Sequence, residues 1–237
     1  MQYATLPNTK CWNFDDTPIG EAVEFRLVYK GKLHAETSSQ SRAKEKHTLR
    51  KVFHKQLAEL WKSHPVLRRE RDKRVLLIGS DPQQFMIIPE TRTEVYSQAI
   101  VWVDHVANNY SRCGYRFLPL ARKANEFTCS LDILFLRRDA PGSLIKHGGD
   151  IDNRIKVLLD GLKMPSTCDE VGGIKPDADE DPFFCLLEDD NLITELKVTT
   201  DRLLVPMNNT EHLHEVELVI RVRISSPGLI LPTNAVL

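Results

Sequence analysis

The chain lacks several features that would place it in a specialised class of protein. None of its apolar runs reaches the roughly 20 residues that a membrane-spanning helix requires. Its first residues lack the basic and then apolar layout of a secretory signal peptide. No internal repeat or low-complexity tract interrupts its 237 residues. These absences predict a globular protein without a membrane segment, and the length suits one large domain or two small ones.

Cysteine is scarce and shows no paired spacing. The five cysteines are an odd number, and neither they nor the histidines recur at the intervals of a zinc site. We therefore expect structural cysteines with reduced thiols rather than a disulfide framework. Reduced thiols are typical of the cytoplasm, which is the compartment that we predict.

The chain also has almost no net charge, which argues against a protein that is basic over its whole surface. Its 32 Lys and Arg residues and 33 Asp and Glu residues sum to −1. The average hides a polarity, because Lys and Arg are concentrated in residues 42–74 and acids predominate in residues 150–201. A basic surface for a polyanion and an acidic pocket for a metal ion would produce this split. Two solvated faces without function would produce it as well.

The apolar periodicity predicts an α+β fold, a mixed sheet of about four or five strands with helices packed on it. We expect one domain at residues 23–225, an N-terminal extension at 1–22 and a C-terminal tail at 226–237. Strands are expected at 24–29, 75–78, 85–88, 127–136, 192–199 and 215–224. Helices are expected at about 41–62, at about 94–108, and between Gly149 and Pro165. Residues 166–182 are polar and predict a long loop.

The first of these helices carries a basic face. Its apolar positions recur at helical spacing, and Lys44, Lys51 and Lys55 fall together on another face. We expect these lysines to form an exposed stripe that binds nucleic acid, with Arg154 of the later helix as a further contact. The alternative is a solvated basic face.

Two acidic clusters carry the clearest chemical signal. Asp150 and Asp152 lie at a loop-to-helix junction with Lys156 one turn beyond, and Asp189 and Asp190 come directly before a predicted strand. Crowded carboxylates repel one another unless a cation lies between them. Separated acidic clusters with one cationic side chain among them suit a divalent-metal site that cleaves phosphodiesters.

Each part of this pattern has a structural explanation when it is taken alone. An Asp near a helix start is favoured as an N-cap and by the helix dipole. The Asp-Asp pair could open a turn before a strand. Lys156 could simply pair with Asp152 or with Asp160, and we expect Asp160 to be structural rather than catalytic. The combination of all these residues in this order favours the metal site.

The ordered pattern resembles the RusA family of Holliday-junction resolvases. That family's signature is Asp-x-Asp-Asn-x-x-Lys, an Asp four residues later, and a downstream Asp-Asp before a strand. Here Gly-Asp-Ile-Asp-Asn-Arg-Ile-Lys occupies 149–156, Leu-Leu-Asp-Gly-Leu occupies 158–162, and Leu-Glu-Asp-Asp-Asn-Leu-Ile-Thr-Glu-Leu occupies 187–196. The resemblance covers about Glu126 to Ile224.

The resemblance implies a structure-selective endonuclease that nicks branched DNA, with Holliday junctions as the leading substrate. It implies Mg²⁺ as the cofactor, with Mn²⁺ as a substitute, and no small-molecule cofactor. It also implies a homodimer, because a four-way junction has approximate two-fold symmetry. The implied metal ligands are Asp150, Asp152 and Asp190. Lys156 is the implied catalytic lysine, and Asp189 and Glu195 match supporting acidic positions.

The chain departs from the family in two segments, residues 65–112 and 164–187, which we predict to be insertions. Substrate recognition depends on such parts, so two alternatives remain. One is a nuclease of the same chemistry that acts on flaps, RNA or invading DNA. The other is a non-catalytic nucleic-acid-binding protein on a resolvase scaffold.

Overall fold

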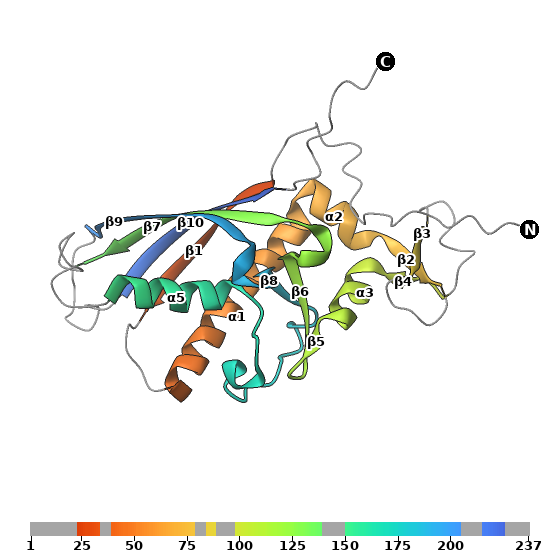
Figure 1. The fold of residues 1–237 in the computed structure, drawn as a ribbon, viewed down its shortest axis with the longest axis horizontal. Helices are drawn as coiled ribbons and strands as arrows, with labels where there is room; N and C mark the ends of the chain where they lie inside the picture. Colours follow the sequence, from red (N-terminus) through yellow and green to blue (C-terminus); the bar gives the residue numbers. More distant parts are fainter. Residues whose placement is uncertain are drawn as a thin grey trace, which may run out of the picture.

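The structure is a computed structural model that describes residues 23–33, 39–78, 84–88, 98–138, 150–204 and 215–225 (Figure 1). Helices and strands both contribute substantially to it, which confirms the predicted α+β class. The predicted extensions at 1–22 and 226–237 lie outside the described residues. Within the described ranges, no helix is long and apolar enough to cross a membrane.

Four strands form the main sheet, in the order β1–β10–β7–β9. They are β1 (Val23–Lys32), β7 (Thr128–Arg137), β9 (Ile193–Arg202) and β10 (Glu215–Ser225). Strand β10 runs antiparallel to both β1 and β7, whereas β9 runs parallel to β7. The predicted strand at 127–136 is therefore an inner strand of this sheet. Alternate apolar residues bury one face of β10, as the sequence predicts.

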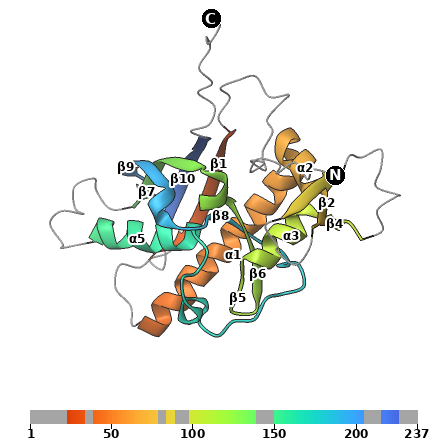
Figure 2. The ribbon, with the colours of Figure 1, turned by 45° about the vertical axis from the view of Figure 1, so that its right-hand side comes forward.

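Two helices lie against the same face of the main sheet (Figures 1 and 2). They are α1 (Ser39–Ser63) and α5 (Asp150–Leu162), both close to their predicted positions. They cross closely at Gly161, where an added Cβ would lie 2.8 Å from the Cβ of Leu49. Glycine therefore allows α5 to approach α1 without a side-chain clash. The predicted apolar stripe of α5 is buried at Ile155, Leu158 and Leu162.

A smaller sheet, which the sequence does not predict, lies on the other side of α1. Strand β6 (Tyr115–Ala121) pairs antiparallel with β5 (Ser111–Arg112) and parallel with β8 (Phe183–Leu187). Helix α1 contacts both β1 and β8, so it is enclosed between the two sheets. Strand β8 leads directly into the Asp-Asp segment, so this sheet helps to position the candidate site.

The segment from Pro65 to Asn109 forms its own group of elements. It contains α2 (Pro65–Asp72), β2 (Arg74–Leu77), β3 (Phe85–Ile88), β4 (Ile100–Val101) and α3 (Trp102–Asn109). The two strands predicted at 75–78 and 85–88 are confirmed as the antiparallel pair β2–β3. The helix predicted at 94–108 is wrong at Ile100 and Val101, because these residues pair with β2 and the helix begins at Trp102.

The cysteines are not all reduced. Cys113, in the turn between β5 and β6, forms a disulfide with Cys168. Our expectation of reduced thiols is therefore wrong for these two residues, and with it falls the cysteine argument for the cytoplasm. The pairing could not be read from spacing, because 55 residues separate the two cysteines. Cys129 and Cys185 are buried and unpaired.

Candidate functional site

Helix α5 presents Asp152 and Lys156 to solvent. The two side chains are 62% and 71% exposed, and Lys156 Nζ lies 3.7 Å from Asp152 Oδ2. Both residues lie off the apolar stripe, as the periodicity predicts, and their ion pair is the expected contact between positions i and i+4. Asp150 is the first residue of α5, but its side chain lies outside the described residues.

The Asp-Asp pair forms a short helical turn, η4 (Asp190–Leu192), between β8 and β9. Asp189 is its N-cap, because Asn191 N donates to Asp189 Oδ1 at 3.1 Å. This backbone hydrogen bond, together with Lys123 Nζ at 3.3 Å from Asp189 Oδ2, holds the pKa of Asp189 below its usual value. The capping explanation thus accounts for Asp189 and leaves Asp190 as the freer carboxylate of the pair.

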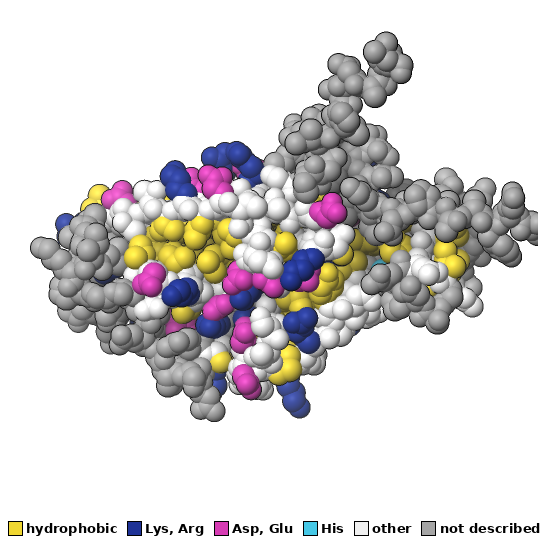
Figure 3. All heavy atoms as spheres, viewed as in Figure 1, with side chains coloured by type: hydrophobic (Ala, Val, Ile, Leu, Met, Phe, Trp, Pro, Cys, Tyr) yellow, Lys and Arg dark blue, Asp and Glu magenta, His cyan; other side chains and the backbone are white. Residues whose placement is uncertain are grey.

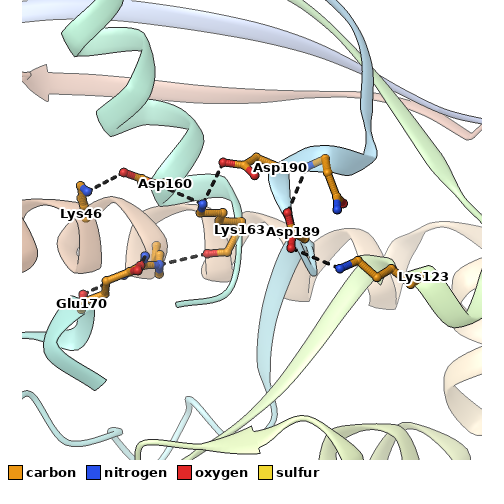
Figure 4. A network of polar contacts seen from close by, with 9 residues as sticks. Lys46, Lys123, Asp160, Lys163, Glu170, Asp189 and Asp190 are labelled. Carbon is orange, nitrogen blue, oxygen red and sulfur yellow. Dashed lines mark hydrogen bonds and ion pairs between the residues drawn. The ribbon is translucent and has the colours of Figure 1, made fainter. Parts of the chain in front are cut away.

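Lys163 joins the two acidic segments (Figure 4). Its Nζ lies 2.8 Å from Asp190 Oδ2 and 3.3 Å from Asp160 Oδ1. Its side chain is only 13% exposed. Burial alone would lower the pKa of Lys163, but the hydrogen bond and ion pairs with these two aspartates raise it above its usual value. An ammonium ion therefore occupies the space between the carboxylates of α5 and η4.

The main chain of Lys163 is fixed from three sides. Its amide donates to Leu159 O at 3.2 Å, and Arg50 Nε donates to its carbonyl at 3.0 Å. A β-bridge pairs Lys163 with Leu187, and Met164 N donates to Leu187 O at 2.9 Å. These contacts bring the end of α5 beside the end of β8, so residues 163 and 190 meet although they are far apart in the sequence.

Asp160 is satisfied by two lysines. Lys46 Nζ lies 2.5 Å from Asp160 Oδ2, and Lys163 contacts the other oxygen. This arrangement fits the structural role that we expected of Asp160. Asp190 is therefore brought to the last turn of α5 rather than to Asp152, which precedes Asp160 by eight residues, or about 12 Å along a helix axis.

Four charged side chains nevertheless form one row along α5. Asp152, Lys156, Asp160 and Lys163 follow at spacings of four, four and three residues, which keeps them on one side of the helix. Figure 3 shows charged side chains of both signs in this region, below a band of hydrophobic side chains. We call these four residues together with Asp190 the charged row. It runs from the start of α5 to η4.

Two residues that we predicted to bind nucleic acid are placed differently. Arg154 is buried, so our expectation of a surface contact is wrong; its position i+3 from Ile151 puts it beside the apolar stripe. Lys51 is not part of an exposed stripe, because its Nζ lies 2.8 Å from Asp177 Oδ2 and 3.0 Å from Glu180 Oε1. Lys44 and Lys55 are exposed.

The partners of Lys51 belong to residues 164–187, which we call the acidic insert. Arg50 is buried and donates to both the carbonyl and the carboxylate of Glu170, at 2.9 and 2.8 Å. His54 contacts Asp179 O, and the insert's Cys168 is tied to Cys113. The acidic insert therefore docks on the basic face of α1, a contact that local sequence patterns do not reveal.

The oxygen donors of the charged row fit a hard divalent cation. Asp152 and Asp190 are exposed carboxylates, and carboxylate oxygen is the ligand that Mg²⁺ and Mn²⁺ prefer. Among the described side chains, no three Asp, Glu, His or Cys residues converge as a ready-made metal group. The expected ligand set includes Asp150, whose side chain is not described. Glu195 is exposed on β9, where it lies in register with Ser130 of β7.

Sequence reasoning missed the lysines that organise the site. Lys163 lies three residues after Asp160, a spacing that allows an ion pair on a helix, and this signal could have been used. Lys123 gives no such signal. It follows β6, and its amide donates to Glu188 Oε2 at 2.8 Å while its ammonium contacts Asp189.

Comparisons with known proteins do not add to this description. No protein-family model matches the chain, and no match is found among curated proteins or among solved structures. The functional argument therefore depends on the chain's own residues and on the motif resemblance described above.

Proposed function

We propose that the protein is a divalent-metal-dependent endonuclease that nicks branched DNA, with four-way junctions as the leading substrate. The observation that carries this proposal is the contact of Lys163 with both Asp160 and Asp190. It makes the two separate acidic motifs parts of one solvent-facing surface. A metal site built from both motifs requires this proximity.

The metal ion, when bound, would supply Lewis-acid polarisation of the phosphate and a water molecule of lowered pKa. Asp150, Asp152 and Asp190 would hold it. Lys156, 71% exposed and beside Asp152, would offset the negative charge that builds on the phosphate during the reaction. Lys163 would keep the carboxylate of Asp190 in place through its ion pair.

A second candidate substrate class follows from the acidic insert. Because it occupies part of the basic face of α1, nucleic acid has less access to that face than the sequence alone indicates. This observation favours a nuclease of the same chemistry on flaps, RNA or invading DNA over a junction enzyme with a fully exposed basic helix.

Cleavage assays on matched substrates test the proposal. A labelled four-way junction, a flap, a duplex, a single strand and an RNA duplex would be incubated with the protein in Mg²⁺, in Mn²⁺ and in EDTA. We expect metal-dependent nicking of the junction above the linear controls, and no nicking by Asp152→Asn, which should still bind DNA. Preferred cleavage of the flap or RNA would select the second candidate. Absence of metal-dependent cleavage of every substrate would refute the nuclease proposal.

A further inference from the structure

The two edges of the main sheet differ in what closes them. At β1, Gln56 of α1 binds the outward backbone, since Val28 N donates to Gln56 Oε1 at 2.9 Å and Gln56 Nε2 donates to Val28 O at 2.7 Å. At β9, within the described part of the chain, no other strand or side chain covers the middle of the ten-residue edge. An open strand edge is a template for pairing with another strand.

The direction of the β9 backbone shows which residues offer these unpaired groups. Leu203 N, just past the strand, donates to Arg137 O of β7 at 2.7 Å. Because backbone groups alternate in direction along a strand, odd-numbered residues here bond toward β7 and even-numbered residues point outward. The amides and carbonyls of Leu196, Val198 and Thr200 therefore face the open edge. At its end the edge is closed by Asp201, whose carboxylate accepts from Arg202 N at 2.7 Å.

The side chains around Leu196 are complementary to their own copy. Leu196 is 44% exposed although it lies in register with the buried Leu131, on the face that α5 covers. Glu195 and Lys197 flank it on the opposite face with opposite charges. Figure 3 shows that the hydrophobic band between the sheet and the charged side chains of α5 is open to solvent on this side of the molecule.

We propose that β9 pairs antiparallel with β9 of a second copy, about a two-fold axis at Leu196. In this register the two Leu196 residues exchange their outward backbone hydrogen bonds. Glu195 then lies directly opposite Lys197 of the partner subunit, and the reverse pair forms by symmetry. Both pairs occupy non-hydrogen-bonded positions, where the side chains approach most closely.

The sign pattern is what selects a second copy as the occupant. A strand edge protected against pairing often carries lysine alone, which repels an identical strand. Here the glutamate two residues earlier turns that repulsion into attraction in one antiparallel register. A two-fold interface uses the same patch on both copies, so self-complementary charges are the feature it requires.

This inference goes beyond the proposed function and does not depend on it. Pairing would join two four-stranded sheets into one of eight strands, with the α5 helices of both copies on the same face. Each charged row would then lie near the shared edge, and the hydrophobic bands would meet.

Sedimentation analysis of the full chain with charge exchange tests the interface. We expect a dimer for the wild type at micromolar concentration. Glu195→Lys places two lysines against two lysines, and Lys197→Glu places two glutamates against two glutamates, so each variant alone should dimerise about tenfold more weakly or worse. An equimolar mixture of the two variants should recover dimerisation, because each heterodimer regains both ion pairs.

A matched control is available on the closed edge. Lys30 of β1 is 64% exposed and pairs with Glu217 across the strands, much as Lys197 is 63% exposed and contacts Asp132 at 3.1 Å. Lys30→Glu should leave the dimer unchanged. A monomeric wild type, single variants that dimerise normally, a mixture that does not recover, or an equal effect of Lys30→Glu would each overturn the proposal.

Discussion

Two regions of the molecule contain lysines or arginines beside carboxylates, and they use these charges differently. Where the acidic insert docks on α1, the cations are withdrawn from solvent: the Arg50 side chain is 0% exposed and that of Lys51 is 24% exposed. At the start of the charged row, Asp152 and Lys156 are 62% and 71% exposed, and their atoms are 3.7 Å apart. The first region has its charges paired closely within the fold, and the second keeps them open to a ligand.

The difference shows why a charge run in the sequence does not identify a binding surface. The basic residues of α1 suggest a phosphate-binding helix, but two of them hold the insert instead. A buried ion pair is costly to break, whereas an exposed pair contributes little to stability. Substitutions in the first region should therefore change folding, and those in the second should change chemistry.

The largest effect is expected from Arg50→Met. It would leave the carboxylate of Glu170 and the carbonyls of Lys163 and Glu170 without their donor. Removal of one partner of a buried ion pair lowers the free energy of unfolding by about 3–5 kcal/mol. Urea denaturation measures it, and a loss below about 1 kcal/mol would mean that the insert is not anchored through this residue.

Lys156→Ala should show the opposite behaviour. If Lys156 stabilises the reacting phosphate, the single-turnover rate should fall about 100- to 1,000-fold while the free energy of unfolding changes by less than about 0.5 kcal/mol. Lys62→Ala is the matched control, since Lys62 is 61% exposed on α1 and lies 3.9 Å from Glu59. If Lys156→Ala lowers only the affinity for DNA, Lys156 positions the substrate and does not act in the reaction.

The region between α1 and the insert should also make stability depend on pH. His47 is fully buried with Nε2 2.9 Å from Tyr115 OH, and burial lowers its pKa from 6.5 to about 4. Below pH 6.5 the unfolded chain binds a proton that the folded protein excludes, so this contribution to stability is present above pH 6.5 and is lost as the pH falls toward about 4. The slope from His47 is at most about 1.4 kcal/mol per pH unit.

Denaturation at a series of pH values measures this slope. His47→Gln should make it shallower between pH 6.5 and about 4. Part of the slope should remain, because burial also lowers the pKa of His54. An unchanged slope in the variant would contradict the assignment to His47.

The smallest effect concerns the rest of the basic face. Lys44 and Lys55 are exposed, so replacing both with Gln should reduce the slope of log affinity for DNA against log salt by about two. Lys51→Gln should not reduce it further, because Asp177 and Glu180 already hold that ammonium. A larger reduction from Lys51→Gln than from the double variant would contradict the docking of the insert.

The parts of the fold that local periodicity determines could be predicted. The strands β1, β7 and β10 and the helices α1 and α5 follow from apolar spacing alone. The β6–β8 pair could not be found, because Pro119 interrupts the first strand and its parallel partner lies more than 60 residues later. Strand β4 was missed because pairing with β2 overrides the helical pattern at Ile100 and Val101.

The same limit applies to the candidate site. The exposure of Asp152 and Lys156 follows from their positions opposite an apolar stripe. The partners of Lys51 and the link from Lys163 to Asp190 depend on how distant segments pack, 126 and 27 residues apart. Sequence therefore identified the chemical groups but not which of them the fold pairs with one another.

The central claim is that the charged row is open to a metal ion and that the carboxylates of the acidic insert are not. Calorimetric titration with Mn²⁺ tests it on the wild type, Asp152→Asn and Asp177→Asn, two exposed aspartates that each contact a lysine and are 62% and 70% exposed. We predict that the wild type and Asp177→Asn bind Mn²⁺ alike and that Asp152→Asn binds it at least about tenfold more weakly. Unchanged binding by Asp152→Asn, or loss of binding by Asp177→Asn, would contradict the account.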